Sequence, residues 1–103
     1  MADDYRLDGK VAVVTGCGRG LGSAIAAAMA REGARLVICD IDAAALEETR
    51  IELESLGAEC LATRCDVSDS ADVDDMFAQA ADRFGPVDIL VNCAGITRDA
   101  TFR

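Results

Sequence analysis

The chain has 103 residues, of which 51% are hydrophobic and only 4% aromatic, a composition typical of one globular domain with a modest aliphatic core. Its formal net charge is −9, from 19 acidic and 10 basic residues, so it lacks the basic surface through which proteins bind nucleic acid. No apolar run is long enough to span a membrane and the first residues are acidic, so we expect no membrane partner and a cytoplasmic location.

The first predicted elements are a strand, a glycine-rich turn and a helix. The apolar, β-branched run over 10–15 predicts a strand that is buried on both faces. The small-residue pattern over 20–31 predicts a helix that buries Leu21, Ile25, Ala28 and Met29. Glycines allow a tight turn and a close approach of the backbone to a ligand, and a helix start presents amide groups to an anion. This region is therefore predicted to cradle a phosphate group.

The spacing of the glycines indicates which kind of cradle this is. The pattern G-x-G-x-x-G fails in both registers, because Leu21 and Ser23 occupy the positions of the third glycine, and no Walker motif follows. What is present is T-G-x-x-x-G-x-G. By the physics of the dinucleotide fingerprint, Gly16 makes the turn, Gly20 admits a pyrophosphate and Gly22 lets the helix pack closely on the strand.

The rest of the chain alternates between helices and strands. Strands are predicted over 35–39, 59–64 and 87–91. Asp42 is expected to cap a helix that buries Leu46, Leu53 and Leu56, and Ser68 a helix that ends at Phe84. This order predicts an α/β fold of the Rossmann type, with a doubly wound parallel sheet of strand order 3-2-1-4 in one domain over 1–103.

An acid follows the second predicted strand. Asp40 comes 18 residues after Gly22, close to the distance at which a dinucleotide-binding fold places the carboxylate that hydrogen-bonds the adenosine ribose. A carboxylate there also repels a 2′-phosphate. The alternative is that Asp40 is a solvated turn residue or a helix cap, a cap that Asp42 could equally provide.

Five cysteines occur without a C-x-x-C pair and without any histidine, so we expect no metal site. Cys39 and Cys93, at strand ends, are interpreted as small buried hydrophobes. Cys17 lies in the glycine turn beside a helix start, where a thiolate would be stabilised. Alkylation of Cys17 is therefore expected to block nucleotide binding.

In these features the sequence resembles the short-chain dehydrogenase/reductase family. Its signals follow the predicted strands in order: the glycine turn, Asp40, the pair Asp66-Val67, and N-C-A-G over 92–95, which is similar to the family's N-N-A-G. The resemblance implies that Asp66 and Val67 lie against an adenine ring. It also implies that the 92–95 segment supports the sheet and contacts the nicotinamide-side ribose. Asp66 as a plain loop acid before Ser68 is the alternative.

The resemblance implies a nicotinamide dinucleotide as cofactor. Asp40 favours NAD, whereas Arg19 occupies a place where members that prefer NADP often carry a basic residue, so NADP stays open. The predicted cofactor-binding residues are Gly16, Arg19, Gly20, Leu21, Gly22, Asp40, Ile41, Asp66, Val67, Asn92, Ala94 and Gly95.

The family implies hydride transfer between a carbonyl and an alcohol, and the segment 96–103 is most similar to 3-oxoacyl-carrier-protein and acetoacetyl-CoA reductases. Family members use a tyrosine, a lysine four residues later and a serine. Tyr5 and Lys10 are the single tyrosine and lysine here and do not have this spacing. No catalytic residue is assigned, and we expect this chain to be an inactive nucleotide-binding half of an oxidoreductase.

Two other functions stay open from the sequence. One is a non-catalytic nucleotide-binding or interaction module, and the more remote one is an S-adenosylmethionine-dependent methyltransferase, which also uses a glycine turn and an acid after its second strand. A sheet that is truncated after the fourth strand would leave that strand as an apolar edge, so self-association through this edge is expected.

Overall fold

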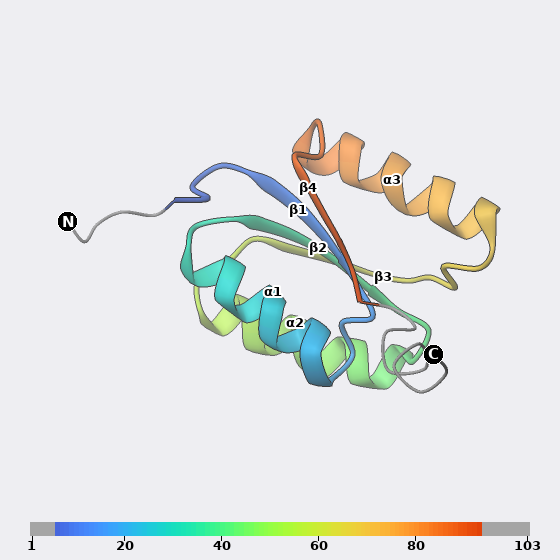
Figure 1. The fold of residues 1–103 in the computed structure, drawn as a ribbon, viewed down its shortest axis with the longest axis horizontal. Helices are drawn as coiled ribbons and strands as arrows, with labels where there is room; N and C mark the ends of the chain where they lie inside the picture. Colours follow the sequence, from blue (N-terminus) through green and yellow to red (C-terminus); the bar gives the residue numbers. More distant parts are fainter. Residues whose placement is uncertain (1–5, 94–103) are drawn as a thin grey trace, which may run out of the picture.

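The computed structural model describes residues 6–93, which form a four-stranded parallel sheet with helices on both faces (Figure 1). The elements are β1 (Val11–Thr15), α1 (Gly20–Arg31), β2 (Arg35–Asp40), α2 (Ala43–Ser55), β3 (Cys60–Arg64), α3 (Ser70–Phe84) and β4 (Ile89–Asn92). The order across the sheet is β3-β2-β1-β4. The predicted α/β fold of the Rossmann type and its strand order are confirmed.

Strand β1 is central because it pairs with β2 on one side and β4 on the other. Val13 aligns with Val37 of β2 and with Leu90 of β4. All five residues of β1 are buried, as required of a strand that is covered by helices on both faces.

The sheet separates two apolar clusters, and successive residues of β1 and β2 face them in turn. On one face, Ala12, Val14, Leu36 and Ile38 pack with residues of α1 and α2. On the other face, Val11, Val13, Val37 and Cys39 pack with Met76 and Ala80 of α3. Figure 1 shows α1 and α2 together below the sheet and α3 alone above it.

Helix α1 packs on the sheet through its smallest side chains, so the predicted buried face is wrong in part. Its buried residues are Gly22, Ala26, Ala27 and Ala30. Leu21 is 56% exposed, Ala28 is also exposed, and Ile25 and Met29 are half-buried. The cause is the close approach of the helix start to the preceding turn, which leaves room under the helix only for glycine and alanine.

The caps and ends of the other elements follow the prediction with small shifts. Asp42 caps α2, and its side chain accepts a hydrogen bond from the Ala45 N–H at 3.1 Å. Helix α3 is capped by Asp69 rather than Ser68, because the Asp69 carboxylate accepts from two N–H groups of the first turn. Strand β4 begins two residues later than predicted, and Leu56 is 39% exposed at the end of α2. Within residues 6–93, no helix combines the length and hydropathy that crossing a bilayer demands.

Candidate functional site

The carboxyl ends of the parallel strands gather the predicted site residues at one edge of the sheet. Thr15, the last residue of β1, aligns with Cys39 of β2 and with Asn92 of β4. Asp40 aligns with Arg64 at the end of β3. Asp40 and Asn92 are therefore the last residues, and the glycine turn and the 66–67 pair come just after the last residues, of strands that end side by side. Parallel α/β sheets bind their ligands at this edge.

The glycine turn has the conformation that its spacing predicts. Gly16 and Gly20 both adopt a φ of +68°, a region that other residues rarely occupy. A Cβ on Gly22 would lie 2.1 Å from the carbonyl oxygen of Gly16, whereas a Cβ on Gly20 would meet nothing within 4 Å. Gly22 thus permits the tight contact of helix and turn, and Gly20 borders open space.

The start of α1 offers backbone donors to this open space. Arg19 is the N-cap residue and makes no side-chain cap, and the first turn contains no acidic residue. The first N–H groups of a helix have no partner within the helix, and they carry the positive end of its dipole. This helix start therefore suits an anionic group.

Gly18, for which the sequence predicted no role, is held through both its backbone N–H and its carbonyl. Its N–H donates to Asp40 Oδ2 at 2.8 Å, and its carbonyl accepts from Thr49 Oγ1 at 3.2 Å. A Cβ on Gly18 would lie 2.8 Å from Asp40 Oδ2, so a side chain here would push the acid away. Thr49 is a buried polar residue within the apolar stripe of α2. A hydroxyl at such a position in the sequence could have indicated a buried hydrogen bond.

Asp40 links the glycine turn to the start of α2. Besides accepting from Gly18, its carboxylate accepts from the Asp42 N–H through Oδ1 at 2.8 Å. Each oxygen of a carboxylate can accept about two hydrogen bonds. Both oxygens of the half-buried Asp40 thus have capacity left for hydroxyl groups. Ile41, the next residue, is 56% exposed.

Arg19 and Asp42 form an ion pair beside Asp40. The distance between Arg19 Nη2 and Asp42 Oδ2 is 3.0 Å, and the two side chains are 77% and 44% exposed. The N–H of Ala45, and after it the charge of Arg19, lower the pKa of Asp42 below its ordinary value. Arg19, the basic residue for which NADP remained a possible cofactor, is thus already paired with an acid.

Asp66 and Val67 lie in the loop that follows β3. Asp66 Oδ1 accepts from the N–H of Ser68 at 3.0 Å and from its hydroxyl at 2.6 Å, and these bonds lower the pKa of Asp66. The loop adjoins the end of β2, because the Cys65 N–H donates to the Asp40 carbonyl at 3.2 Å. Val67 is 39% exposed and presents an apolar surface at this edge.

Asn92 is tied to the end of β1. The Thr15 hydroxyl donates to Asn92 Oδ1 at 2.6 Å, and the Cys93 N–H donates to the Thr15 carbonyl at 3.2 Å. Cys93 is buried. Of the predicted site residues, Ala94 and Gly95 lie outside the described residues, as does the segment 96–103.

The prediction of a reactive Cys17 is wrong. All five cysteines are free and buried. Cys17 has no exposed surface and its thiol donates to the Gly22 carbonyl at 3.5 Å. Burial raises its pKa far above the ordinary value, so a thiolate does not form near neutral pH. Proximity to the helix start is outweighed by desolvation. Within residues 6–93, no group of three or more candidate ligand side chains is arranged to hold a metal ion.

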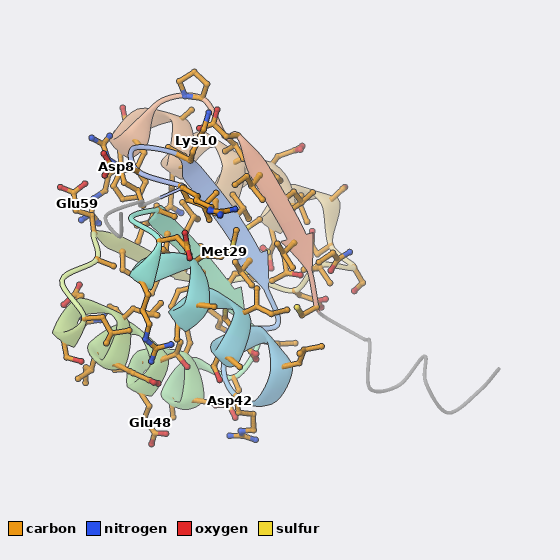
Figure 2. All side chains as sticks on the ribbon, turned by 60° about the vertical axis from the view of Figure 1, so that its left-hand side comes forward. Asp8, Lys10, Met29, Asp42, Glu48 and Glu59 are labelled. Atoms are coloured by element: carbon orange, nitrogen blue, oxygen red, sulfur yellow. The ribbon has the colours of Figure 1, made fainter. Side chains whose placement is uncertain are left out.

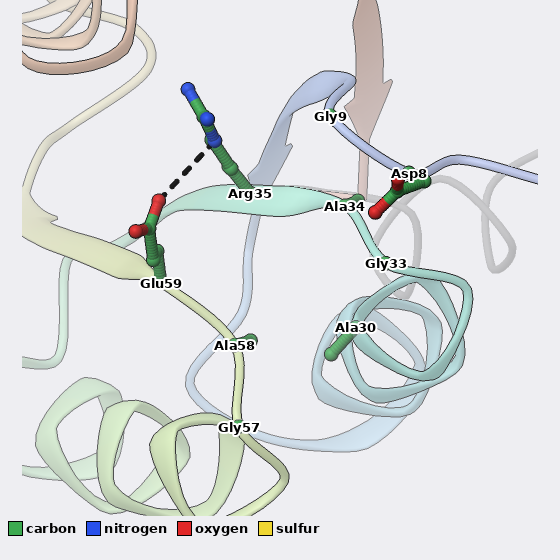
Figure 3. Close-up of a pocket in the computed structure, with 9 residues that line it drawn as sticks. All are labelled: Asp8, Gly9, Ala30, Gly33, Ala34, Arg35, Gly57, Ala58 and Glu59. Atoms are coloured by element: carbon green, nitrogen blue, oxygen red, sulfur yellow. Dashed lines mark ion pairs between the residues drawn. The ribbon is translucent and has the colours of Figure 1, made fainter. Parts of the chain in front are cut away.

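A pocket lies at the opposite edge of the sheet, where β2 and β3 begin (Figure 3). Arg35 and Glu59 at its rim form an ion pair of 3.2 Å. The remaining lining residues are small or lie at turns, namely Asp8, Gly9, Ala30, Gly33, Ala34, Gly57 and Ala58. Because its charged side chains pair with each other or lie at the rim, we assign no chemistry to this pocket.

Comparison with known proteins places this geometry in a family. The family model described as short chain dehydrogenase matches residues 10–103. An uncharacterized oxidoreductase from Mycobacterium bovis is 46% identical over 99 residues, which cover 94% of this chain and 39% of that protein. The chain thus spans about two fifths of the length of this curated relative.

Two solved structures with bound cofactor are similar to this chain. A 7α-hydroxysteroid dehydrogenase in complex with NADH and 7-oxo glycochenodeoxycholic acid is 40% identical with a TM-score of 0.83, over 89% of this chain and 36% of that chain. A variant of actinorhodin polyketide ketoreductase with NADPH is 38% identical with a TM-score of 0.81, over 84% and 33%. Both hold a nicotinamide dinucleotide, which is NADH in the first and NADPH, with its additional 2′-phosphate, in the second.

Proposed function

Because this chain belongs to the short chain dehydrogenase family, we propose that it forms the cofactor-binding half of an NAD(P)-dependent oxidoreductase. The observation that carries this proposal is the 2.8 Å hydrogen bond between the Gly18 N–H and Asp40. It joins a turn suited to phosphate and an acid suited to ribose into one continuous surface. The family match also favours an oxidoreductase over the methyltransferase that the sequence left open.

The proposed site holds the dinucleotide along the carboxyl edge of the sheet. The backbone from Gly16 to Gly22, which includes Arg19 and Leu21, would receive the pyrophosphate at the start of α1. The Asp40 carboxylate would accept hydrogen bonds from the adenosine ribose hydroxyls, next to the exposed Ile41. The open space at Gly20 and the spare acceptor capacity of Asp40 both fit such a ligand.

The remaining site residues are proposed to hold the two rings. The adenine ring would lie on Val67 beside Asp66, whose carboxylate is held in place by Ser68. The nicotinamide-side ribose would contact Asn92, together with Ala94 and Gly95. The Asn92 side chain accepts from Thr15 and is therefore fixed at the end of β4.

The bound cofactor would supply hydride transfer between a carbonyl and an alcohol. The residues of this chain bind and orient it, and none of them is assigned to proton transfer. Lys10 is exposed and precedes β1, which places it at the sheet edge opposite to the glycine turn. We therefore expect residues 1–103 alone to bind the dinucleotide without turning it over. A 3-oxoacyl compound is the proposed substrate class of the whole enzyme, on the resemblance of the segment 96–103.

Asp40 is proposed to favour NAD over NADP, and titration of the chain with NADH and NADPH tests this proposal. Replacing Asp40→Ala together with Ile41→Arg removes the repelling charge and adds a phosphate partner. We expect the ratio of the NADPH to the NADH dissociation constant to fall by about tenfold or more, in line with the loss of one repulsive and the gain of one attractive charge.

The control is Glu48→Ala with Ile51→Arg, which makes the same change of charge on exposed residues of α2. This pair should leave the ratio unchanged. An unchanged ratio in the Asp40 pair would show that the acid does not face the 2′ position.

A further inference from the structure

Three charged side chains gather where α1 and α2 begin. Arg19 precedes α1, Asp40 ends β2 and Asp42 precedes α2. Figure 2 shows Asp42 at the start of α2, beside the first turn of α1. The three are linked through short contacts, because Asp40 accepts the N–H of Gly18 and of Asp42, while Asp42 pairs with Arg19.

Asp40 and Asp42 accept hydrogen bonds from different donors. Both oxygens of Asp40 accept backbone N–H groups, at 2.8 Å each. Asp42 accepts the Ala45 N–H through Oδ1 and the Arg19 guanidinium through Oδ2, at 3.1 and 3.0 Å. The helix cap fixes Asp42 in position, and Asp42 in turn holds the guanidinium at the start of α2.

We propose that Asp42 is a second determinant of cofactor selectivity, because it engages Arg19 and so withholds this guanidinium from the 2′-phosphate of NADP. The inference rests on the proposed function of the site. With Asp42 ionised, the cluster carries two acids and one base, and a phosphate dianion must compete with a carboxylate for the single guanidinium. The preference for NAD would then come from Asp40 by direct repulsion and from Asp42 through Arg19.

The exposure of the pair sets the size of the expected effect. Arg19 is 77% exposed, and ion pairs between exposed side chains are weak in water. A 2′-phosphate can therefore break the pair at a modest cost, so Asp42 should lower NADP affinity without abolishing it. Screening by salt should shrink the effect further.

The test is the affinity of the chain for NADPH and NADH after Asp42→Asn. Asparagine is also a good N-cap, so this variant keeps α2 intact while it removes the charge. We expect NADPH affinity to rise about two- to fivefold relative to NADH, with little change in NADH affinity. In an Arg19→Gln background most of this gain should disappear, because no guanidinium is left to be released.

Glu48→Gln is the matched control, since it removes one negative charge from an exposed residue of the same helix (Figure 2). It should not change the ratio of the two affinities. An unchanged ratio in Asp42→Asn, or a gain that persists in full without Arg19, would overturn the inference. If the unaltered chain bound neither dinucleotide, the proposed function itself would fail, whereas normal NADH binding with an unchanged ratio would refute only the role of Asp42.

Discussion

At the scale of single residues, the position of the glycine turn depends on two side chains that hold the backbone of Gly18. Asp40 accepts the Gly18 N–H from one side, and Thr49 donates to the Gly18 carbonyl from the other. Thr49 is only 3% exposed, so the hydrogen bond of its hydroxyl is shielded from solvent. The turn is thereby fixed relative to both β2 and α2 before any ligand binds.

Thr49→Val should therefore destabilise the chain and weaken its hold on the nucleotide. The substitution keeps the shape of the side chain but removes the buried donor, which typically costs about 1–3 kcal/mol. Urea unfolding would measure the free energy of unfolding, and titration with NADH the affinity. Thr49→Ser keeps the hydroxyl and should restore most of both. Equal stability of the Val variant and the unaltered chain would contradict the role given to this hydrogen bond.

The cysteines make stability sensitive to alkaline pH. Burial raises the pKa of Cys39 and Cys60 from 9.0 to about 12, and the pKa of Cys17 rises as well. The folded state thus keeps these protons while the unfolded state loses them near pH 9. Stability should be constant below about pH 9 and should decline as the pH rises towards 12.

Urea unfolding between pH 7 and pH 10.5 measures this decline, and few other groups interfere because the chain has one tyrosine and one lysine. In parallel, all five thiols should react with a thiol reagent only as the chain unfolds. Rapid reaction of Cys17 in the folded chain would show that the glycine turn opens.

At the scale of elements, the alternation of strands and helices was predictable because β1, β2 and β4 are short apolar runs and a glycine follows each helix. The packing of α1 was not. Periodicity assigns the large residues to the core, but the contact of Gly22 with the Gly16 carbonyl selects the glycine and alanine face instead. Only the three-dimensional approach of helix and turn reveals this.

The site shows the same division. The positions of Asp40 and Asn92 at the carboxyl edge could be predicted, because both residues end apolar runs in the sequence. Gly18 and Thr49 could not, because their roles depend on contacts between residues far apart in the sequence. The cap of α3 was misassigned by one residue, since Ser68 and Asp69 are both good N-cap residues, and the choice depends on which of them the loop leaves free.

At this scale, the testable feature is the outer edge of strand β4. It pairs with β1 alone among the described strands, and Leu90 is 57% exposed. An apolar strand edge favours pairing with a second copy of the chain. Leu90→Lys should therefore shift the chain towards monomer at high protein concentration, as measured by sedimentation. Ile51→Lys replaces an equally exposed apolar residue on α2 and should have no such effect, and a similar response of both variants would rule out this edge.

At the scale of the whole molecule, the net charge of −9 opposes the binding of an anionic ligand. Long-range repulsion disfavours any phosphate, so binding must rely on local donors. We propose that the start of α1 and the turn before it provide them at one edge of the sheet, and that Asp40 selects what lies next to the phosphate. The central claim is that this combination binds a nicotinamide dinucleotide.

The most direct test is NADH binding by the unaltered chain, by Gly20→Val and by Gly57→Val, measured by calorimetry. Both glycines have a positive φ and open space where a Cβ would be, so both variants should lose a similar stability of about 1–2 kcal/mol. Only Gly20 borders the proposed pyrophosphate site. The account predicts that NADH binds to the unaltered chain and to Gly57→Val and that its affinity falls at least about tenfold in Gly20→Val. Equal affinity in the two variants, or no binding by the unaltered chain, would contradict it.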